Sequence, residues 1–237
     1  EEGFGYTYKW DSVENTLNLV DTKKDESILP SRYSYYDVGR LGKIKDQGIY
    51  GTCWAFASLT AVETSLMPEE KYDFSEDNMV WNSGYFGAQY DGGDYTRAIS
   101  YLASWRGPVL EEDDVYGDGI NNPDAGVVKH VQEAQIIESK NLEAVKKAVF
   151  LYGGVESSLY TSMSYAGERS MYYNDKNYSY CYIGTKKPNH DVVIIGWDDN
   201  YSKDNFSVSL EGNGAFICVN SWGDRFGDDG LFYVSYY

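Results

Sequence analysis

The chain has 237 residues, which is enough to bury a substantial hydrophobic core without disulfide bonds. Hydrophobic residues make up 42% and charged residues 24%, a composition typical of globular proteins that excludes a disordered chain. Its 20 basic and 37 acidic residues give a net charge of −17, which argues against binding to nucleic acid or to an anionic membrane surface. No stretch reaches the roughly 20 apolar residues needed to cross a bilayer, so we expect no membrane insertion.

The first long helix that the sequence predicts is preceded by irregular chain. Residues 1–27 are polar and end in the charged run DTKKDES, and we expect them to form an N-terminal extension. Residues 28–45 read as extended chain and loops, because Pro30 and two glycines interrupt any periodicity. Residues 53–67, CWAFASLTAVETSLM, contain no Gly or Pro and are apolar on nearly every face. They predict a buried central helix that Pro68 ends.

Three shorter helices are expected further along the chain. Ser75 is a suitable N-cap for the first, whose opening turn is acidic. A Gly-Gly turn leads into a second helix over about residues 95–104, and the run NLEAVKKAVFLYG forms an amphipathic third, closed by glycines. The acidic, turn-rich residues 111–126 lack the ligand spacing of a calcium loop, so no metal is expected there.

The second half of the chain changes from helical to strand periodicity. The runs GVESSLY, HDVVIIGWDD, GAFICVNSWG and GLFYVSYY are short, rich in β-forming residues and separated by Gly, Asn and Asp. Helices in the first half and strands in the second predict an α+β protein with two unlike halves.

Four side chains together could provide what a thiol nucleophile requires, namely a lowered pKa, a base, a group that orients the base, and donors for an oxyanion. Cys53 stands at the start of the central helix, where the helix dipole favours a thiolate. His190 opens one β-rich run and Asn220 ends the next, so the Asn amide oxygen could accept the imidazole N–H if the strands pair. The side-chain amide of Gln47, with the Cys53 backbone N–H, would form an oxyanion hole.

Simpler interpretations exist for some of these residues. By its position alone, Cys53 could equally be a buried structural thiol in a central helix. A histidine more often completes a core than takes part in catalysis, and we interpret His130 in that way. Trp222 is expected to cover the bond between His190 and Asn220 and to keep water from it.

The blocks QGIYGTCWAFAS, NHDVVIIGW and NSWG resemble the three active-site blocks of the papain family of cysteine proteases. The resemblance continues through FSEDNMVWNSG, DGGDYTRAISYL and LEAVKKAVFLYGGVESSLY, and covers about residues 28–237. It implies a papain-like two-lobe fold, with the active-site cleft between a helical lobe and an antiparallel β-barrel-like lobe. The helical lobe would span about residues 46–138, and the β-rich lobe about 139–237 plus 28–45.

The resemblance also implies an activity. The chain would be a cysteine endopeptidase that hydrolyses peptide bonds through a thiolate–imidazolium pair and an acyl-enzyme, with no cofactor and no metal. The implied catalytic residues are Cys53, His190, Asn220 and Gln47. The implied substrate-binding residues are Gly92, Gly93, Trp222, Asn189 and Trp54. The expected partners are polypeptide substrates, and the expected state is a monomer.

The sequence departs from the family pattern at its cysteines. Tyr50 and Asn82 occupy the positions of a disulfide that is common in the family, so both halves of that bridge are absent. Cys181 and Cys218 could pair only if their Cα atoms came within about 7 Å, and we expect both to be reduced. The missing bridge and the acidity suggest a secreted or cell-surface bacterial branch.

Three other functions stay open at this point. The first is an exopeptidase of the same fold, in which residues 1–27 or 111–126 would block one end of the cleft. The second is another Cys–His acyl-transfer enzyme, such as a transglutaminase-like or transpeptidase protein. The third is a catalytically inactive papain-like binding module on a surface protein.

Overall fold

The computed structural model describes residues 29–84 and 90–237, so the expected N-terminal extension lies outside the described residues. The helices are α2 (Cys53–Leu66), α3 (Glu76–Asn82), α4 (Tyr95–Ala103), α5 (Leu142–Leu151) and the short 3₁₀ helix η1 (Lys203–Asn205). The strands are β1 (Arg32–Ser34), β2 (Val155–Leu159), β3 (Tyr173–Asn174), β4 (Ser179–Tyr180), β5 (His190–Asp198), β6 (Ala215–Val219) and β7 (Leu231–Ser235).

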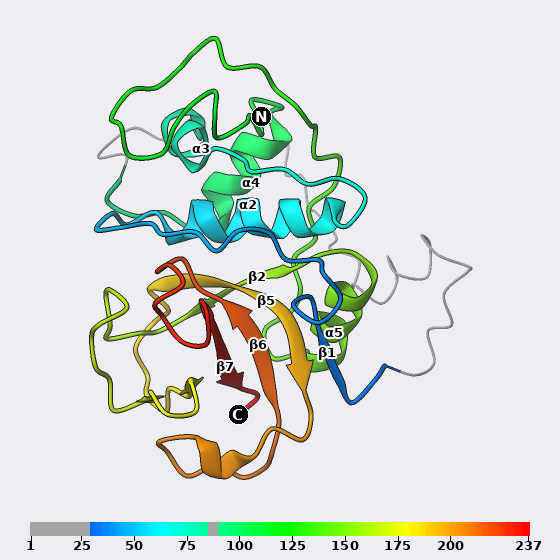
Figure 1. The fold of residues 1–237 in the computed structure, drawn as a ribbon, viewed down its shortest axis with the longest axis vertical. Coiled ribbons are helices and arrows are strands. Elements are labelled where there is room, and N and C mark those ends of the chain that lie inside the picture. The colour runs from blue at the N-terminus through cyan, green and yellow to red at the C-terminus, as the bar shows by residue number, and fades with distance from the viewer. Residues whose placement is uncertain (1–28, 85–89) are drawn as a thin grey trace, which may run out of the picture.

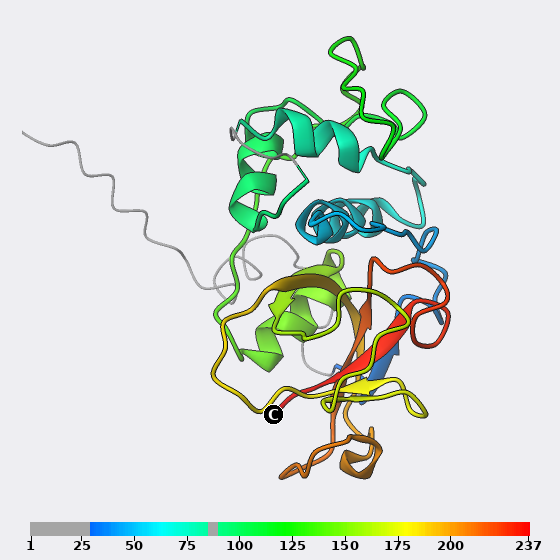
Figure 2. The same ribbon diagram turned by 90° about the vertical axis from the view of Figure 1, so that its left-hand side faces the viewer.

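The molecule has two lobes, which confirms the α+β two-lobe expectation. Helices α3 and α4 lie on one side of α2, and the sheet lies on the other side together with α5 (Figures 1 and 2). Each of the four predicted α-helices is present, with ends within a residue or two of the expected ones. The exact lobe boundary near residue 138 stays a prediction. Among the helices of the described residues, none is long and apolar enough to span a bilayer.

Helix α2 is apolar on nearly every face because it packs into two separate cores. Trp54, Ala55 and Leu59 belong to the core of the helical lobe. Ala57, on another face of the same helix, belongs to the core of the β-rich lobe. The other α-helices begin with side-chain caps from Ser75, Asp94 and Asn141, whereas α2 has none.

Strand β5 is the centre of the sheet. It pairs antiparallel with β1, β2 and β6, and β6 pairs antiparallel with β7. Strand β4 joins β7 in parallel and carries β3 on its other edge. Eight of the nine residues of β5 are buried, which fits the continuous apolar run in its sequence. The start of this rigid strand is therefore a well-fixed position for a functional side chain.

The structure corrects one expectation and bears out another. His130, expected in the core, is exposed, and its ring stacks on that of Trp105 with centroids 4.6 Å apart. The expectation failed because residues 126–138 form no helix or strand and run along the surface. Cys181 and Cys218 are buried free thiols, as expected, and Cys53 is also free.

Candidate active site

Cys53 is the first residue of α2, and its side chain is in a position suited to negative charge. The N-cap residue, Thr52, makes no side-chain capping bond to the helix, and its hydroxyl bonds instead to the Tyr116 hydroxyl at 2.6 Å. The first backbone N–H groups of a helix have no acceptor within the helix. The backbone N–H groups of Trp54 and Asp191 hydrogen-bond to the Cys53 sulfur and lower the thiol pKa. Both donors and the helix dipole favour a thiolate at this position.

His190 is held by the amide of Asn220. The imidazole Nε2 lies 2.7 Å from Asn220 Oδ1, which confirms that the two strands pair and bring these side chains together. The same oxygen accepts the backbone N–H of Ser221 at 2.8 Å, which fixes the orientation of the amide. Because the oxygen is an acceptor, Nε2 must carry the hydrogen, and Nδ1 of the neutral imidazole is left as an acceptor.

Trp222 covers this pair, as the sequence predicted. Its ring lies 4.7 Å from the imidazole, centroid to centroid, with 30° between the planes. It also packs against the ring of Phe226, with centroids 5.0 Å apart, and its side chain is buried. A buried indole over the bond between His190 and Asn220 keeps water away from it, which strengthens the bond.

Gln47 is fixed in place by Ser221, a residue that the sequence analysis missed. Gln47 Oε1 accepts the Ser221 hydroxyl at 2.6 Å, and the Gln47 backbone N–H donates to the Ser221 carbonyl at 2.8 Å. Its amide nitrogen donates one hydrogen to the Tyr50 carbonyl at 2.6 Å and carries a second. Ser221 thus links Gln47 to Asn220. The only feature of the sequence that could have indicated this role was the place of Ser221 within the NSWG block.

Burial opposes a charge on either member of the Cys53–His190 pair. Desolvation, helped by the carboxylate of Asp191, raises the pKa of Cys53 to about 11, despite the backbone donors. Desolvation also lowers the pKa of His190 to about 4, although the hydrogen bond that its ring donates to Asn220 acts in the opposite direction. A thiolate or an imidazolium alone is therefore unfavourable here. The two charges would have to form together, by proton transfer between the partners, so that each compensates the other.

Gly92 and Gly93 meet structural requirements that explain the Gly-Gly turn. Gly92 has φ +126°, a conformation that side chains rarely adopt, and a Cβ on Gly93 would lie 2.4 Å from Nε1 of Trp54. Trp54 itself is fully buried, and in the part of the chain that the structure describes its Nε1 has no hydrogen-bond partner. Trp54 was expected to bind substrate; its indole lies in the core of the helical lobe, next to Gly93, and a contact with substrate stays a prediction.

Asn189 is exposed, but both ends of its amide are occupied. Its Oδ1 accepts the Thr161 backbone N–H at 2.7 Å, and its Nδ2 donates to the Thr161 carbonyl at 2.9 Å. These bonds hold the loop that leads into His190. The amide keeps a second hydrogen and a second lone pair, and a role of Asn189 in substrate binding stays a prediction.

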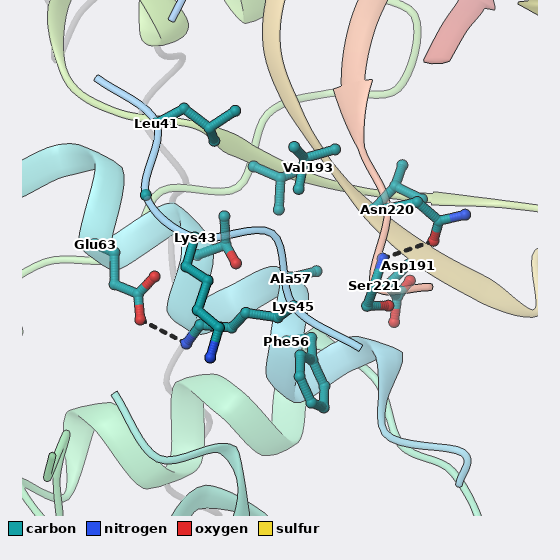
Figure 3. Close-up of a pocket in the computed structure, with 14 residues that line it drawn as sticks. Leu41, Lys43, Lys45, Phe56, Ala57, Glu63, Asp191, Val193, Asn220 and Ser221 are labelled. Carbon is teal, nitrogen blue, oxygen red and sulfur yellow. Dashed lines mark hydrogen bonds and ion pairs between the residues drawn. The ribbon is translucent and has the colours of Figure 1, made fainter. Parts of the chain in front are cut away.

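A small cavity lies beside Asn220 and Ser221 (Figure 3). It is about 10 Å³, enough for one water molecule, and lies between α2, the start of β5 and the chain segment 41–45. Its lining includes Ala57, Asp191, Asn220 and Ser221. The Glu63 carboxylate and Lys45 also line it, joined by the ion pair drawn in Figure 3.

Lys45 ties the segment before Gln47 to the helical lobe. Its ammonium lies 2.8 Å from Glu63, 2.7 Å from Glu76 and 2.9 Å from Asp73. The side chains of Lys45, Glu63 and Glu76 are each less than a tenth exposed. This buried network fixes the start of the segment that carries the predicted oxyanion residue.

Residues 29–236 match the family described as papain family cysteine protease. The chain belongs to this family. Falcipain-3 of Plasmodium falciparum (isolate 3D7) is 27% identical in an alignment of 232 residues that covers 95% of this chain and 44% of falcipain-3. A cysteine protease of Blomia tropicalis is 27% identical in an alignment of 257 residues, gaps included, that covers 99% of this chain and 71% of that protein.

Solved structures show the same papain-family fold. The clostridial cysteine protease Cwp84 after propeptide cleavage is 34% identical with a TM-score of 0.77, covering 87% of this chain and 54% of that chain. A second Cwp84 structure, with protease and lectin-like domains, is described as a surface layer associated protein of Clostridium difficile and is 33% identical. The chain spans about half the length of falcipain-3 and of the Cwp84 chains.

The site of this papain-family chain also contains acidic residues that the sequence analysis did not single out. Asp191 directly follows His190, is 5% exposed and accepts the Ser158 hydroxyl at 2.6 Å. Glu156 accepts the Ser58 hydroxyl of α2 and is half-buried. A signal was present for Asp191, because its carboxylate interrupts a run of residues that otherwise reads as a core strand.

Proposed function

We propose that the chain is a cysteine endopeptidase in which Cys53 is the nucleophile and His190 the general base and acid. The observation that carries the proposal is the hydrogen bond between Asn220 and His190, the first residue of β5. The backbone N–H of the next residue, Asp191, contacts the Cys53 sulfur. This arrangement leaves Nδ1 of the imidazole for the thiol proton. A papain-family match over residues 29–236 supports it.

The reaction would proceed in two halves. In the first, Nδ1 of His190 takes the thiol proton, and the thiolate attacks the scissile carbonyl carbon to form a C–S bond. The imidazolium then returns the proton to the leaving amine as the C–N bond breaks. In the second half, His190 takes a proton from a water molecule, whose oxygen attacks the thioester. The C–S bond breaks, the acid is released, and Cys53 regains its proton.

The remaining residues would bind and stabilise. The free amide hydrogen of Gln47 and the Cys53 backbone N–H would hold the developing oxyanion, a type of interaction that contributes about 3–4 kcal/mol per donor. The backbone at Gly92 and Gly93 would pair with an extended substrate as a short added strand. Trp222 would border the leaving-group side while it shields the catalytic histidine.

Labelling with an epoxysuccinyl peptide, combined with cleavage of casein, tests the proposal. We expect the epoxide to modify Cys53 and not Cys181 or Cys218, which are 2% and 1% exposed. We expect Cys53→Ala to abolish casein cleavage while Cys218→Ala, a matched control outside the site, retains it. Undiminished cleavage by the Cys53→Ala variant would overturn the assignment.

We also propose that the enzyme is a monomer that acts on polypeptides outside the cell or at the surface of a bacterium. The similarity to Cwp84, described as surface layer associated, supports this location. Fractionation of the producing bacterium into cytoplasm, cell wall and medium tests it, with recovery only in the cytoplasm as the contrary result. Light scattering coupled to gel filtration tests the monomer.

A further inference from the structure

Two carboxylates lie beside the Cys53 thiol on the same face of the sheet. The register of β2 and β5 pairs Ser158 with Asp191. Glu156 precedes Ser158 by two residues, so it projects from the same face as Asp191. Both carboxylates raise the pKa of Cys53 through their charge, which places them close to the sulfur.

Asp94 extends this group of carboxylates to the surface. It follows Gly93, is exposed, and caps α4 by accepting the Thr96 backbone N–H at 2.9 Å. Its charge raises the pKa of both Glu156 and Asp191, so the three carboxylates are near enough to repel one another. We refer to Asp94, Glu156 and Asp191 as the acidic cluster. It leads from the exposed start of α4 to a nearly enclosed interior beside the nucleophile.

The acidic cluster has no compensating cation within the part of the chain that the structure describes. Among the described residues, 29–84 and 90–237, no ion pair involves any of its three carboxylates. Glu156 also has an unsatisfied oxygen: Oε2 accepts the Ser58 hydroxyl, whereas Oε1 is enclosed and has no hydrogen-bond partner among the described residues. An enclosed polar oxygen without a partner is unfavourable whether the carboxyl is protonated or ionised, and a cationic group bound beside it would favour the ionised form.

We propose that the acidic cluster binds the side chain of a lysine or arginine of the substrate, and that the enzyme therefore prefers to cleave close to a cationic residue. This inference rests on the proposed function, because it names the substrate class of the same site. The cationic residue would lie on the acyl side of the scissile bond, since Asp94 directly follows Gly93, where the substrate backbone would pair.

The chemistry of a cationic side chain matches what the cluster lacks. An ammonium or guanidinium group would donate to Glu156 Oε1 and to Asp191, and would offset the repulsion between the carboxylates. The long aliphatic stem would pass the exposed Ser158 and Asp94 on its way inward. The net charge of −17 would also attract cationic polypeptides over longer distances.

Matched peptides test the inference on the full chain. Each pair has lysine in one peptide and norleucine, which has a similar shape and no charge, in the other. Three pairs place this difference at the first, second or third position before the scissile bond. We expect kcat/KM to be about 10- to 100-fold higher for lysine at one position, the size of a charge-assisted hydrogen bond. We expect Glu156→Gln and Asp191→Asn each to reduce this ratio, and Asp118→Asn, in an exposed loop, to retain it.

The ratio is a robust measure, because both peptides are tested on one preparation and the fraction of folded enzyme cancels. A wild-type ratio near one at all three positions would overturn the inference, as would an unchanged ratio in both variants. In either case cleavage of the norleucine peptides and labelling of Cys53 would leave the proposed function standing. Absence of both cleavage and labelling would instead overturn the proposed function, and the inference with it.

Discussion

Replacing Lys45 with Met should destabilise the protein strongly, because it leaves two buried carboxylates without their cation. Glu63 and Glu76 lie 2.8 and 2.7 Å from the Lys45 ammonium, and their side chains are 5% and 2% exposed. Removing one member of a buried ion pair costs about 3–5 kcal/mol. Asp73, at 45% exposure, adds less than about 1 kcal/mol. We expect a loss of about 3–5 kcal/mol, equivalent to about 6–20 °C in Tm for a domain of this size.

Urea denaturation followed by tryptophan fluorescence at pH 7 measures this loss, with an unchanged m value as evidence of an unchanged denatured state. Lys43→Met is the matched control: Lys43 is exposed, so its replacement should alter stability by less than about 0.5 kcal/mol. Adding Glu63→Gln to Lys45→Met should recover part of the loss, because the uncompensated charge is gone. If Lys45→Met were no more destabilising than Lys43→Met, the network would contribute nothing and the reasoning would be wrong.

Three further predictions concern the site. Asn220→Ala should lower kcat about 10- to 100-fold, because His190 loses the partner that fixes its tautomer; steady-state kinetics measure it. Gly93→Ala should lower kcat/KM more than about tenfold, because the added Cβ would lie 2.4 Å from Trp54 Nε1 and displace the turn; the same assay detects it. Burial raises the pKa of Glu156 to about 8 from an ordinary 4.5, so folded protein holds a proton that unfolded chain releases. This lowers stability as pH rises from 4.5 to 8, by at most about 1.4 kcal/mol per pH unit. Glu156→Gln should remove that dependence, and urea denaturation at pH 5, 6.5 and 8 measures it.

Each of these three has a result that would contradict it. An Asn220→Ala variant with wild-type kcat would show that the imidazole needs no fixed tautomer. Gly92→Ala is an informative companion to Gly93→Ala, since its Cβ would meet nothing within 4 Å although its φ is +126°. If Gly93→Ala were the milder change, contact with Trp54 would not be what demands a glycine. A wild-type pH slope in Glu156→Gln would mean that the carboxyl is already ionised in the folded protein.

The sequence predicted the elements of the fold better than their contacts. Helix α2 was predictable because its residues are apolar all round, but that pattern does not show that two different cores bury it. The bond between His190 and Asn220 was predictable from roles and motifs. The position of Glu156 was not, since it depends on the register of β2 against β5, and a slip of one residue would turn its side chain to the opposite face. His130 was misplaced because residues 126–138 follow no regular period.

The sharing of α2 between two cores has a consequence for how the protein comes apart. Local opening usually detaches a segment with few buried contacts. Helix α2 differs from such a segment, because unfolding either lobe removes part of its packing and disturbs the first helical turn, which carries Cys53. The two lobes therefore form one cooperative unit, and neither half of the chain would be a self-sufficient folding fragment.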